Sequence, residues 1–310
     1  MSRHCASCGR LLCRDSFSKN QWTKPIGVSR CHACVHGTSG ANEPPPPPKQ
    51  SERHNHASWA TFKYHALRKP FAQGSFRWVA QGVYTNGERE GEKCVCKWFK
   101  EGSVYEEEFY ADDLKAVEKA KHIIKEWNAR DFVDKPVVLN IPEVWTFEHD
   151  GLSHFSGART LQEPFIENYQ KFNSNSGWAD SSVPWARVMQ ALSHFSYHAT
   201  RGQLLLCDLQ GGVYRDGVVL TDPVVSSRSK SYGATDLGPA GISTFFSQHR
   251  CNEFCRKEWQ RPADQKRYLP VRRGSSMMSS LEHVQTQLSR AALSAPPPPP
   301  AIYEEDSDDY

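Results

Sequence analysis

The sequence of 310 residues predicts an α+β fold for its main domain, preceded by a small metal-binding module. Segments typical of strands crowd the first half of that domain, and amphipathic helical segments are more frequent in the second half. Two pairs of closely spaced cysteines near the N-terminus indicate the module. Because 38% of the residues are hydrophobic, a chain of this length can build a core of its own.

Overall charge and apolar content exclude several classes of protein. The formal net charge of +3, from 38 basic and 35 acidic residues, is too balanced to indicate nucleic-acid binding by the whole chain. No stretch approaches the roughly 18 consecutive apolar residues of a membrane span, and the N-terminal residues lack the apolar core of a signal peptide. We therefore expect no membrane partner and a cytoplasmic location, with a nuclear one left open. In such a compartment, ten cysteines favour metal binding over disulfides.

Two runs of five prolines bracket the main domain, at residues 44–48 and 296–300. Proline is incompatible with a helix interior or a central strand, so both runs are expected to be extended spacers. The last residues are rich in serine and end in EEDSDDY, which predicts disorder, with only a transient helix over 281–293. These signals divide the chain into a zinc module (1–37), a proline-rich linker (38–57), a main domain (58–273) and a tail (274–310).

The main domain begins with a predicted hairpin. Residues 76–85 (FRWVAQGVYT) and 94–99 (CVCKWF) are strand-like, and a polar turn separates them. Residues 114–130 carry apolar side chains at helical spacing and predict a helix. After Pro136, residues 137–147 favour a strand.

The second half of the domain repeats a helix and a strand. Residues 185–200 (WARVMQALSHFSYHAT) predict a second long helix, and residues 203–210 (QLLLCDLQ) predict a buried strand. This strand ends on polar residues, and the polar residue Asp222 follows the next apolar run, in LTDP. Two apolar runs that each end on a carboxylate raise the question of a shared site.

The N-terminal module carries two CxxC pairs separated by 22 residues, and four thiolates in this pattern suit tetrahedral zinc. A module this small cannot bury a core, so the metal would supply most of its folding free energy. The alternatives are unligated thiols, or a substitute ligand from Cys13, His4, His32 or His36. The predicted ligands are Cys5, Cys8, Cys31 and Cys34.

The partner of the module is open between nucleic acid and protein. The module is basic, with six lysines and arginines, and Trp22 offers a ring for stacking. Its pattern CASCGRLL…FSKNQWTK…SRCHACV resembles the zinc-ribbon-like module of the Stc1 type. That resemblance implies protein interaction.

Lys97, in the strand CVCKWF, follows a glycine-bearing segment by the length of a hairpin. A fixed cation under a glycine-containing cover can neutralise phosphate oxygens. An isolated strand lysine is more often a solvated surface residue, so Lys97 needs further support. Asp208 and Gln210 provide it, because residues i and i+2 of a strand share a face. With Asp222 they offer the oxygen ligands that Mg²⁺ prefers, although each alone is explained as a polar strand end.

A third group of residues indicates a second zinc site. His249, Cys251 and Cys255 lie within seven residues, near the start or inside of a predicted helix. Three such ligands are typical of a zinc site that takes its fourth ligand from elsewhere. The candidates for the fourth ligand are His194 and His198, both on the helix predicted over 185–200.

The chain from about residue 71 to residue 256 resembles the alpha-kinase family of atypical protein kinases. The resemblance rests on ordered motifs, PFAQGSFRWV, CVCKWF, EPFIENYQKFNSNSG, ALSHFSYHATRGQLLLCDLQGG, LTDP, YGATDLGPAGISTFF and HRCNEFC. It implies a two-lobed protein-kinase-like fold with ATP between the lobes and a structural zinc in the C-terminal lobe. It also implies a serine/threonine protein kinase that transfers phosphate from Mg-ATP to protein substrates. The alternatives are an inactive kinase-like scaffold and a zinc protein that binds nucleic acid or protein.

The resemblance also implies roles for individual residues. Lys97 would contact the nucleotide phosphates, and Glu163 would lie at the hinge that contacts adenine. Asp208 would position the substrate hydroxyl, and Gln210 and Asp222 would hold Mg²⁺. The implied glycine-rich loop carries Gly233 and Gly238, and the implied zinc ligands are His194, His249, Cys251 and Cys255.

Overall fold

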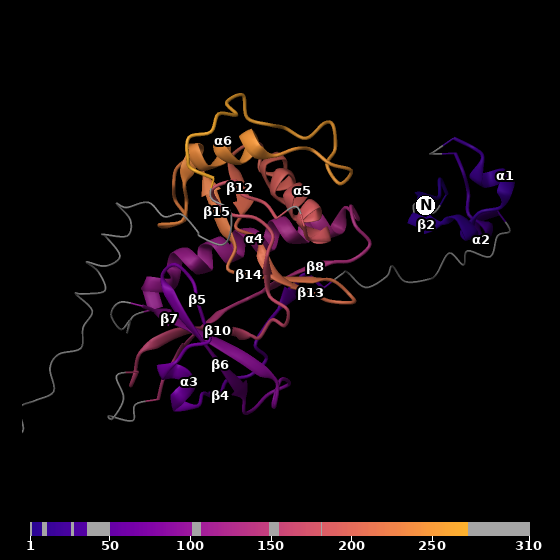
Figure 1. Cartoon of the computed structure of the whole chain (residues 1–310). Coiled ribbons are helices and arrows are strands. Elements are labelled where there is room, and N and C mark those ends of the chain that lie inside the picture. The colour runs from indigo at the N-terminus through magenta and orange to yellow at the C-terminus, as the bar shows by residue number, and fades with distance from the viewer. Residues whose placement is uncertain are drawn as a thin grey trace, which may run out of the picture. The chain divides into compact units, whose positions relative to one another are not determined.

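The computed structural model describes residues 2–7, 11–25, 28–35, 50–100, 107–148, 155–180 and 182–271. The chain forms two compact units, residues 1–48 and residues 49–310, and each is described by itself (Figure 1). The sequence predicts a linker as far as residue 57, but the structure places its last residues inside the second unit. There the strand Glu52–Arg53 pairs with a neighbour, and Asn55 is fully buried.

The N-terminal unit is small and has a thiol-rich core. Its first two strands pair in antiparallel register. Its buried apolar cluster consists of Cys5, Phe17, Cys31 and Cys34. Its elements are β1 (Ser2–His4), β2 (Leu11–Cys13), η1 (Arg14–Ser16), α1 (Lys19–Trp22) and α2 (His32–Val35).

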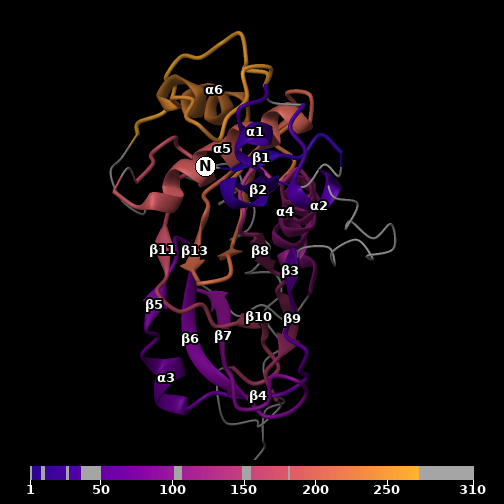
Figure 2. The same cartoon turned by 90° about the vertical axis from the view of Figure 1, so that its right-hand side faces the viewer.

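The first lobe of the main unit is built on a six-stranded sheet in the order β4-β6-β7-β10-β9, with β5 also paired to β6. The predicted hairpin is confirmed, because β6 and β7 pair antiparallel from Arg77↔Phe99 to Val83↔Lys93. Figure 2 shows this sheet at one end of the unit, with α3 beside it. The elements are β4 (Ala60–Thr61), α3 (Tyr64–Arg68), β5 (Ala72–Gln73), β6 (Arg77–Tyr84), β7 (Lys93–Phe99), β9 (Glu143–Thr146) and β10 (Arg159–Pro164).

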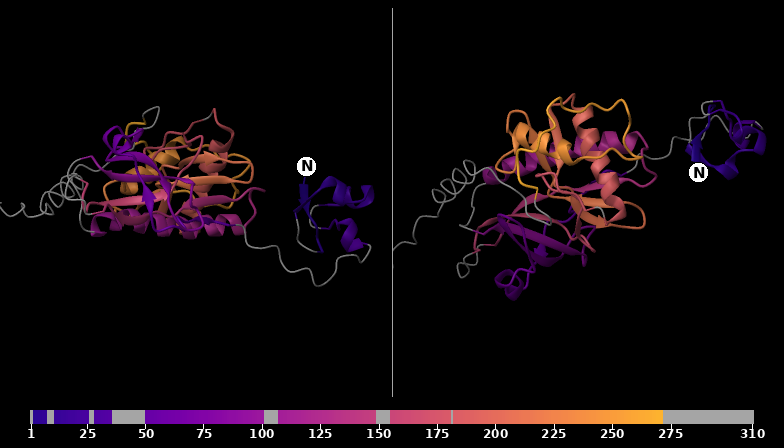
Figure 3. Two further views of the ribbon diagram at one scale, coloured as in Figure 1. Left: turned by 90° about the horizontal axis from the view of Figure 1, so that it is seen from below. Right: turned by 45° about the horizontal axis from the view of Figure 1, so that its top comes forward.

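The other lobe combines helices with two further sheets. A five-stranded sheet has the order β11-β13-β14-β8-β3, and β12 pairs with β15. The elements are β3 (Glu52–Arg53), η2 (Glu107–Tyr110), α4 (Ala111–Ala129), β8 (Val137–Asn140), β11 (Gln170–Lys171), α5 (Pro184–Ala199), β12 (Leu204–Cys207), β13 (Gln210–Val213), β14 (Val218–Thr221), β15 (Val224–Ser227) and α6 (Gly238–Gln248). The helices lie at the end of the unit opposite α3 (Figure 3).

Both predicted long helices form, as α4 and α5. The buried residues of α4 recur at helical spacing. They include Trp127, whose ring packs against Phe132, Phe195 and Trp259. This cluster joins α4, α5 and the strands beneath them into one core. Among the described residues, the structure has no helix whose length and apolar character would allow it to cross a bilayer.

Two predicted strands differ from the structure. The strand predicted over 137–147 is divided into β8 and β9, which belong to different sheets. Pro142 lies at the break between them. Proline has no amide hydrogen, so one continuous strand would lose a hydrogen bond of its ladder here. The strand predicted over 203–210 ends at Cys207, because Asp208 adopts a left-handed backbone with φ 56°. The chain therefore turns at this carboxylate and begins β13 at Gln210.

Candidate active site

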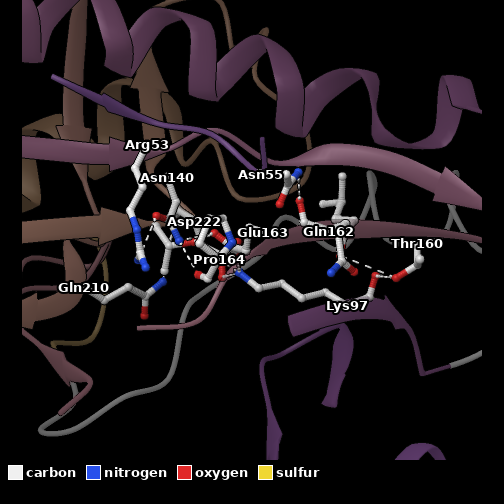
Figure 4. A network of polar contacts seen from close by, with 12 residues as sticks. Arg53, Asn55, Lys97, Asn140, Thr160, Gln162, Glu163, Pro164, Gln210 and Asp222 are labelled. Atoms are coloured by element: carbon white, nitrogen blue, oxygen red, sulfur yellow. Dashed lines mark hydrogen bonds and ion pairs between the residues drawn. The ribbon is translucent and has the colours of Figure 1, made fainter. Parts of the chain in front are cut away.

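Lys97 lies at the centre of a buried charge cluster. Lys97 opposes Leu161 and Val95 opposes Glu163 in the β7–β10 ladder, so the lysine and the glutamate project from one face. The Lys97 ammonium forms an ion pair with Glu163, and its Nζ lies 2.6 Å from Asp222 Oδ2. Lys97 is only 7% exposed and Glu163 2%. The solvated surface lysine considered above is therefore the wrong reading of Lys97 (Figure 4).

Residues around this cluster fix the glutamate. Thr221 Oγ1 donates to Glu163 Oε2 at 2.6 Å, and Asn140 Nδ2 donates to the same oxygen at 3.0 Å. Lys97 Nζ also donates to Thr221 Oγ1 at 3.2 Å. Because Glu163 and Thr221 are themselves held by hydrogen bonds, the lysine is held in one position.

The electrostatics favour the charged forms of Lys97 and Asp222. Burial alone would lower the pKa of Lys97, but the carboxylates of Asp222 and Glu163 outweigh it and raise that pKa. Burial likewise opposes ionisation of Asp222, yet the adjacent Lys97 ammonium holds its pKa below the ordinary value. Lys97 and Asp222 are therefore both charged at neutral pH, since each lies at hydrogen-bond distance from an opposite charge.

Asp208 and Asp222 follow the ends of β12 and β14, as predicted, and both have left-handed backbones, with φ of 56° and 47°. Short polar side chains are the ones that tolerate this conformation. Gln210 joins the two aspartates, since its Nε2 lies 3.2 Å from Asp208 Oδ2 and 3.5 Å from the Asp222 carbonyl oxygen. Asp208 and Gln210 therefore lie close together, as predicted.

Lys171, on β11, is a site residue that the sequence analysis missed. Its Nζ lies 2.9 Å from Asp208 Oδ1 and 3.1 Å from Oδ2. Burial raises the pKa of Asp208, and the Lys171 cation and the Asn175 amide at 3.3 Å oppose that rise. The motif QKFNSNSG contains both residues, but nothing in its spacing points to a carboxylate 37 residues away.

Arg77, on β6, was also missed. Its Nη2 donates to Asp113 Oδ2 of α4 at 2.5 Å, and its guanidinium lies over the rings of Phe99 and Tyr110. Its charge helps to lower the pKa of Asp222. An arginine within a strand-like segment was the only signal for it in the sequence.

The side chain of Glu163 is engaged with Lys97, Thr221 and Asn140 inside the protein. The place of Glu163 at the hinge that contacts adenine, which the resemblance implies, stays a prediction. The carboxylate positions the lysine.

The loop predicted to be glycine-rich is organised by a buried carboxylate. Gly233 and Gly238 have φ of 77° and 64°, a conformation that favours glycine. Asp236 accepts hydrogen bonds from the backbone amides of Ser227, Tyr232 and Gly238, at 2.8, 3.2 and 2.9 Å. The loop also contacts the residue that bonds to Asp208, because Asn175 Nδ2 donates to the Thr235 carbonyl oxygen at 3.1 Å and its backbone amide donates to Asp208.

The four residues His194, His249, Cys251 and Cys255 converge, and their ligand atoms all lie within 4.8 Å of one another. Cys251 Sγ is 3.7 Å from His194 Nδ1, and Cys255 Sγ is 3.7 Å from His249 Nε2. Donors around tetrahedral zinc are separated by about 3.6 Å, so this set fits the metal. The last three residues follow α6 instead of lying inside a helix, since His249 is its C-cap.

The surroundings of these histidines suit metal ligands. The second ring nitrogen of His194, Nε2, lies 3.0 Å from the Gln260 carbonyl oxygen, an arrangement that leaves Nδ1 free to ligate. Burial lowers the pKa of His194 to about 4 and of His249 to about 3, so both rings are neutral. His198 Nδ1 instead accepts from the Gln260 amide at 3.4 Å and lies outside the set.

The sulfurs of Cys5, Cys31 and Cys34 also lie within 4.8 Å of one another. Backbone amides of Ser7 and Cys31 donate to Cys5 Sγ at 3.4 and 3.3 Å, contacts that favour a thiolate. Cys8, the fourth predicted ligand, lies outside the described residues.

Comparison with known proteins identifies a family to which the chain is similar. The sequence model of the alpha-kinase family matches residues 72–255. The chain is 28% identical over 195 residues to alpha-protein kinase vwkA of Dictyostelium discoideum, covering 61% of this chain and 30% of that protein. It is 31% identical over 191 residues to alpha-protein kinase 1 of the same organism, covering 60% of this chain and 13% of that protein. The chain thus spans less than a third of the length of these relatives.

Two solved structures share the fold. The alpha-kinase domain of myosin-II heavy chain kinase A, in an inactive form complexed with ATP, is 24% identical with a TM-score of 0.53, covering 63% of this chain and 87% of that one. An alpha kinase from Entamoeba histolytica is 21% identical with a TM-score of 0.52, covering 68% of this chain and 82% of that one. At this identity the likeness shows the fold.

Proposed function

Because the chain belongs to the alpha-kinase family, we propose that its main unit is a serine/threonine protein kinase that transfers the γ-phosphate of Mg-ATP to protein substrates. The observation that carries the proposal is the convergence of Lys97, Asp208 and Asp222, from β7 and the ends of β12 and β14. The relative crystallised with ATP supports the choice of nucleotide.

Each side chain has a distinct task in this proposal. Lys97, fixed by Glu163, holds phosphate oxygens through its charge. Asp208 orients the substrate hydroxyl in line with the phosphate and takes its proton, and the Lys171 cation opposes the rise in pKa that burial causes at Asp208. Asp222 and Gln210 supply oxygen donors suited to Mg²⁺, which when bound neutralises charge on the transferred phosphate.

We propose zinc for both thiol-containing clusters. The site of His194, His249, Cys251 and Cys255 has four protein ligands and no open position, so its role is structural. In the N-terminal unit, the metal would tie together a core made largely of thiols. This unit would bring the kinase to a protein or nucleic-acid partner.

Phosphate transfer tests the main proposal. The full chain is incubated with labelled ATP, Mg²⁺ and a basic protein, beside Asp208→Asn and Asp222→Asn variants. Asparagine retains the left-handed backbone of both positions, so the variants lose charge without local strain. We expect transfer to fall at least about 100-fold in each, with Asp216→Asn in an exposed turn as the control.

Analysis of the labelled residue tests the hydroxyl specificity, with phosphothreonine or phosphoserine expected and phosphotyrosine contradicting it. Absence of transfer by the folded, zinc-loaded protein would refute the kinase proposal. An interaction scaffold would then be the better assignment.

A further inference from the structure

The segment between residues 59 and 73 forms an edge of the first sheet. Strands β4 and β5 both pair with β6, and β7 pairs with β6 as well. The helix α3 connects β4 to β5 and lies near β6 (Figure 1). The edge is remote from α5, which carries His194, and from α6, which the other candidate zinc ligands follow (Figure 2).

This edge exposes large apolar side chains. Trp59 is 56% exposed, and Tyr64 and Phe71 are each 57% exposed. Val83, the cross-strand neighbour of Thr61, is 41% exposed. These are four of the six exposed large hydrophobic residues in the described part of the main unit, the others being Tyr169 and Tyr268. A local concentration of this kind marks an interaction surface more often than chance exposure does.

The same edge is positively charged. Lys63, Arg68 and Lys69 are exposed, and none of them forms a salt bridge with a carboxylate of the described residues. Arg68 lies over the ring of Tyr64, 5.8 Å from its centroid. We call residues 59–71 together with Val83 the α3 surface. Its chemistry suits a ligand that combines flat apolar groups with negative charge.

We propose that the α3 surface is the docking site for residues 296–310 of the same chain. This segment, PPPPPAIYEEDSDDY, joins five prolines, an isoleucine and two tyrosines to five carboxylates. Proline rings pack on exposed aromatic faces, as in the recognition of proline-rich segments, and the carboxylates would face Lys63, Arg68 and Lys69. The complementarity of both apolar and charged groups selects this segment.

Covalent connection also favours this occupant over a separate acidic protein. Residues 272–295 join the segment to the described domain, and 24 residues can span up to about 80 Å. A tethered ligand has an effective concentration on the order of millimolar, so modest contacts suffice for docking. The inference depends on no step of the proposed catalysis.

Photo-crosslinking in the full chain tests this docking. Tyr64→p-benzoylphenylalanine places a reactive group on the α3 surface, and Tyr169→p-benzoylphenylalanine provides a control at a similarly exposed position. We expect crosslinks from position 64, and not from 169, to map within residues 296–310. The products should migrate as single chains at all protein concentrations.

Charge variants establish specificity. In the protein that carries the photo-crosslinker at position 64, Lys63→Glu together with Arg68→Glu should lower the crosslinking yield about five-fold. Amide substitutions of the five carboxylates in residues 296–310 should have the same effect. The matched pair Lys125→Glu and Lys257→Glu, at exposed positions elsewhere, should leave the yield unchanged. Crosslinks that join two copies, or that never reach residues 296–310, would overturn the proposal, as would equal yields in both charge pairs.

Discussion

Lys97 shows how much a single buried charge depends on distant partners. Its strand position could be predicted, but Glu163 and Asp222 lie 66 and 125 positions away, and burial comes from their contact. A buried ion pair gains little over apolar packing, yet it is costly to break from one side. Replacement of Lys97 should therefore reduce stability and activity far more than replacement of an exposed lysine.

Lys97→Met should destabilise the main unit by about 3–5 kcal/mol, because it leaves two carboxylates without their cation. Phosphate transfer should also be lost. Lys93→Met, on the same strand, removes an exposed pair with Glu167 and should cost under about 1 kcal/mol. Urea unfolding measures both. Equal losses in the two variants would contradict the buried role of Lys97.

At the scale of elements, the connection between β15 and α6 depends on Asp236. The loop passes through two left-handed glycines and has no ladder of its own to satisfy its amides. The Asp236 carboxylate, 1% exposed, accepts from the last amide of β15, from Tyr232 in the loop and from the first amide of α6. The shape of the loop is therefore set by a side chain.

Asp236→Ala should cost about 3 kcal/mol, since it leaves three buried amides without an acceptor. Asp236→Asn keeps one acceptor oxygen and should lose less. Asp216→Ala, in the exposed turn between β13 and β14, is the control and should be close to neutral. A wild-type melting temperature for Asp236→Ala would show that the loop has other supports.

The two thiol-containing clusters should bind metal independently. Elemental analysis of the full chain is expected to give two zinc ions, and Cys251→Ser or Cys31→Ser should each remove one. Cys251→Ser should lower the melting temperature of the main unit by about 10 °C, because the proposed metal would join α5 to the residues after α6. A full complement of two ions in either variant would exclude that cluster as a site.

At the scale of the whole molecule, each cluster of buried apolar side chains among the described residues lies within one of the two units. Removal of residues 1–48 should therefore change the melting temperature of the main unit by less than about 2 °C and leave phosphate transfer intact. Calorimetry of the two proteins measures the difference. A large shift would show that the units stabilise each other.

The sequence predicts the parts of this molecule that depend on local pattern. The helices α4 and α5, the β6–β7 hairpin and the two strand ends carrying Asp208 and Asp222 follow from periodicity and spacing. It could not predict contacts between distant segments. Lys171 meets Asp208, and Arg77 meets Asp113, only after β11 and α4 have taken their places. The division of residues 137–147 between two sheets is likewise a tertiary effect.

The cluster of His194, His249, Cys251 and Cys255 closes a long loop of the chain. The loop begins on α5 and ends after α6, so it contains β12 to β15 and both aspartates of the candidate active site. With metal bound, protease cleavage after Arg215, in the exposed β13–β14 turn, would leave two fragments clipped together. The nicked protein should elute as one species in native gel filtration, and a chelator should lower the temperature at which its two fragments separate.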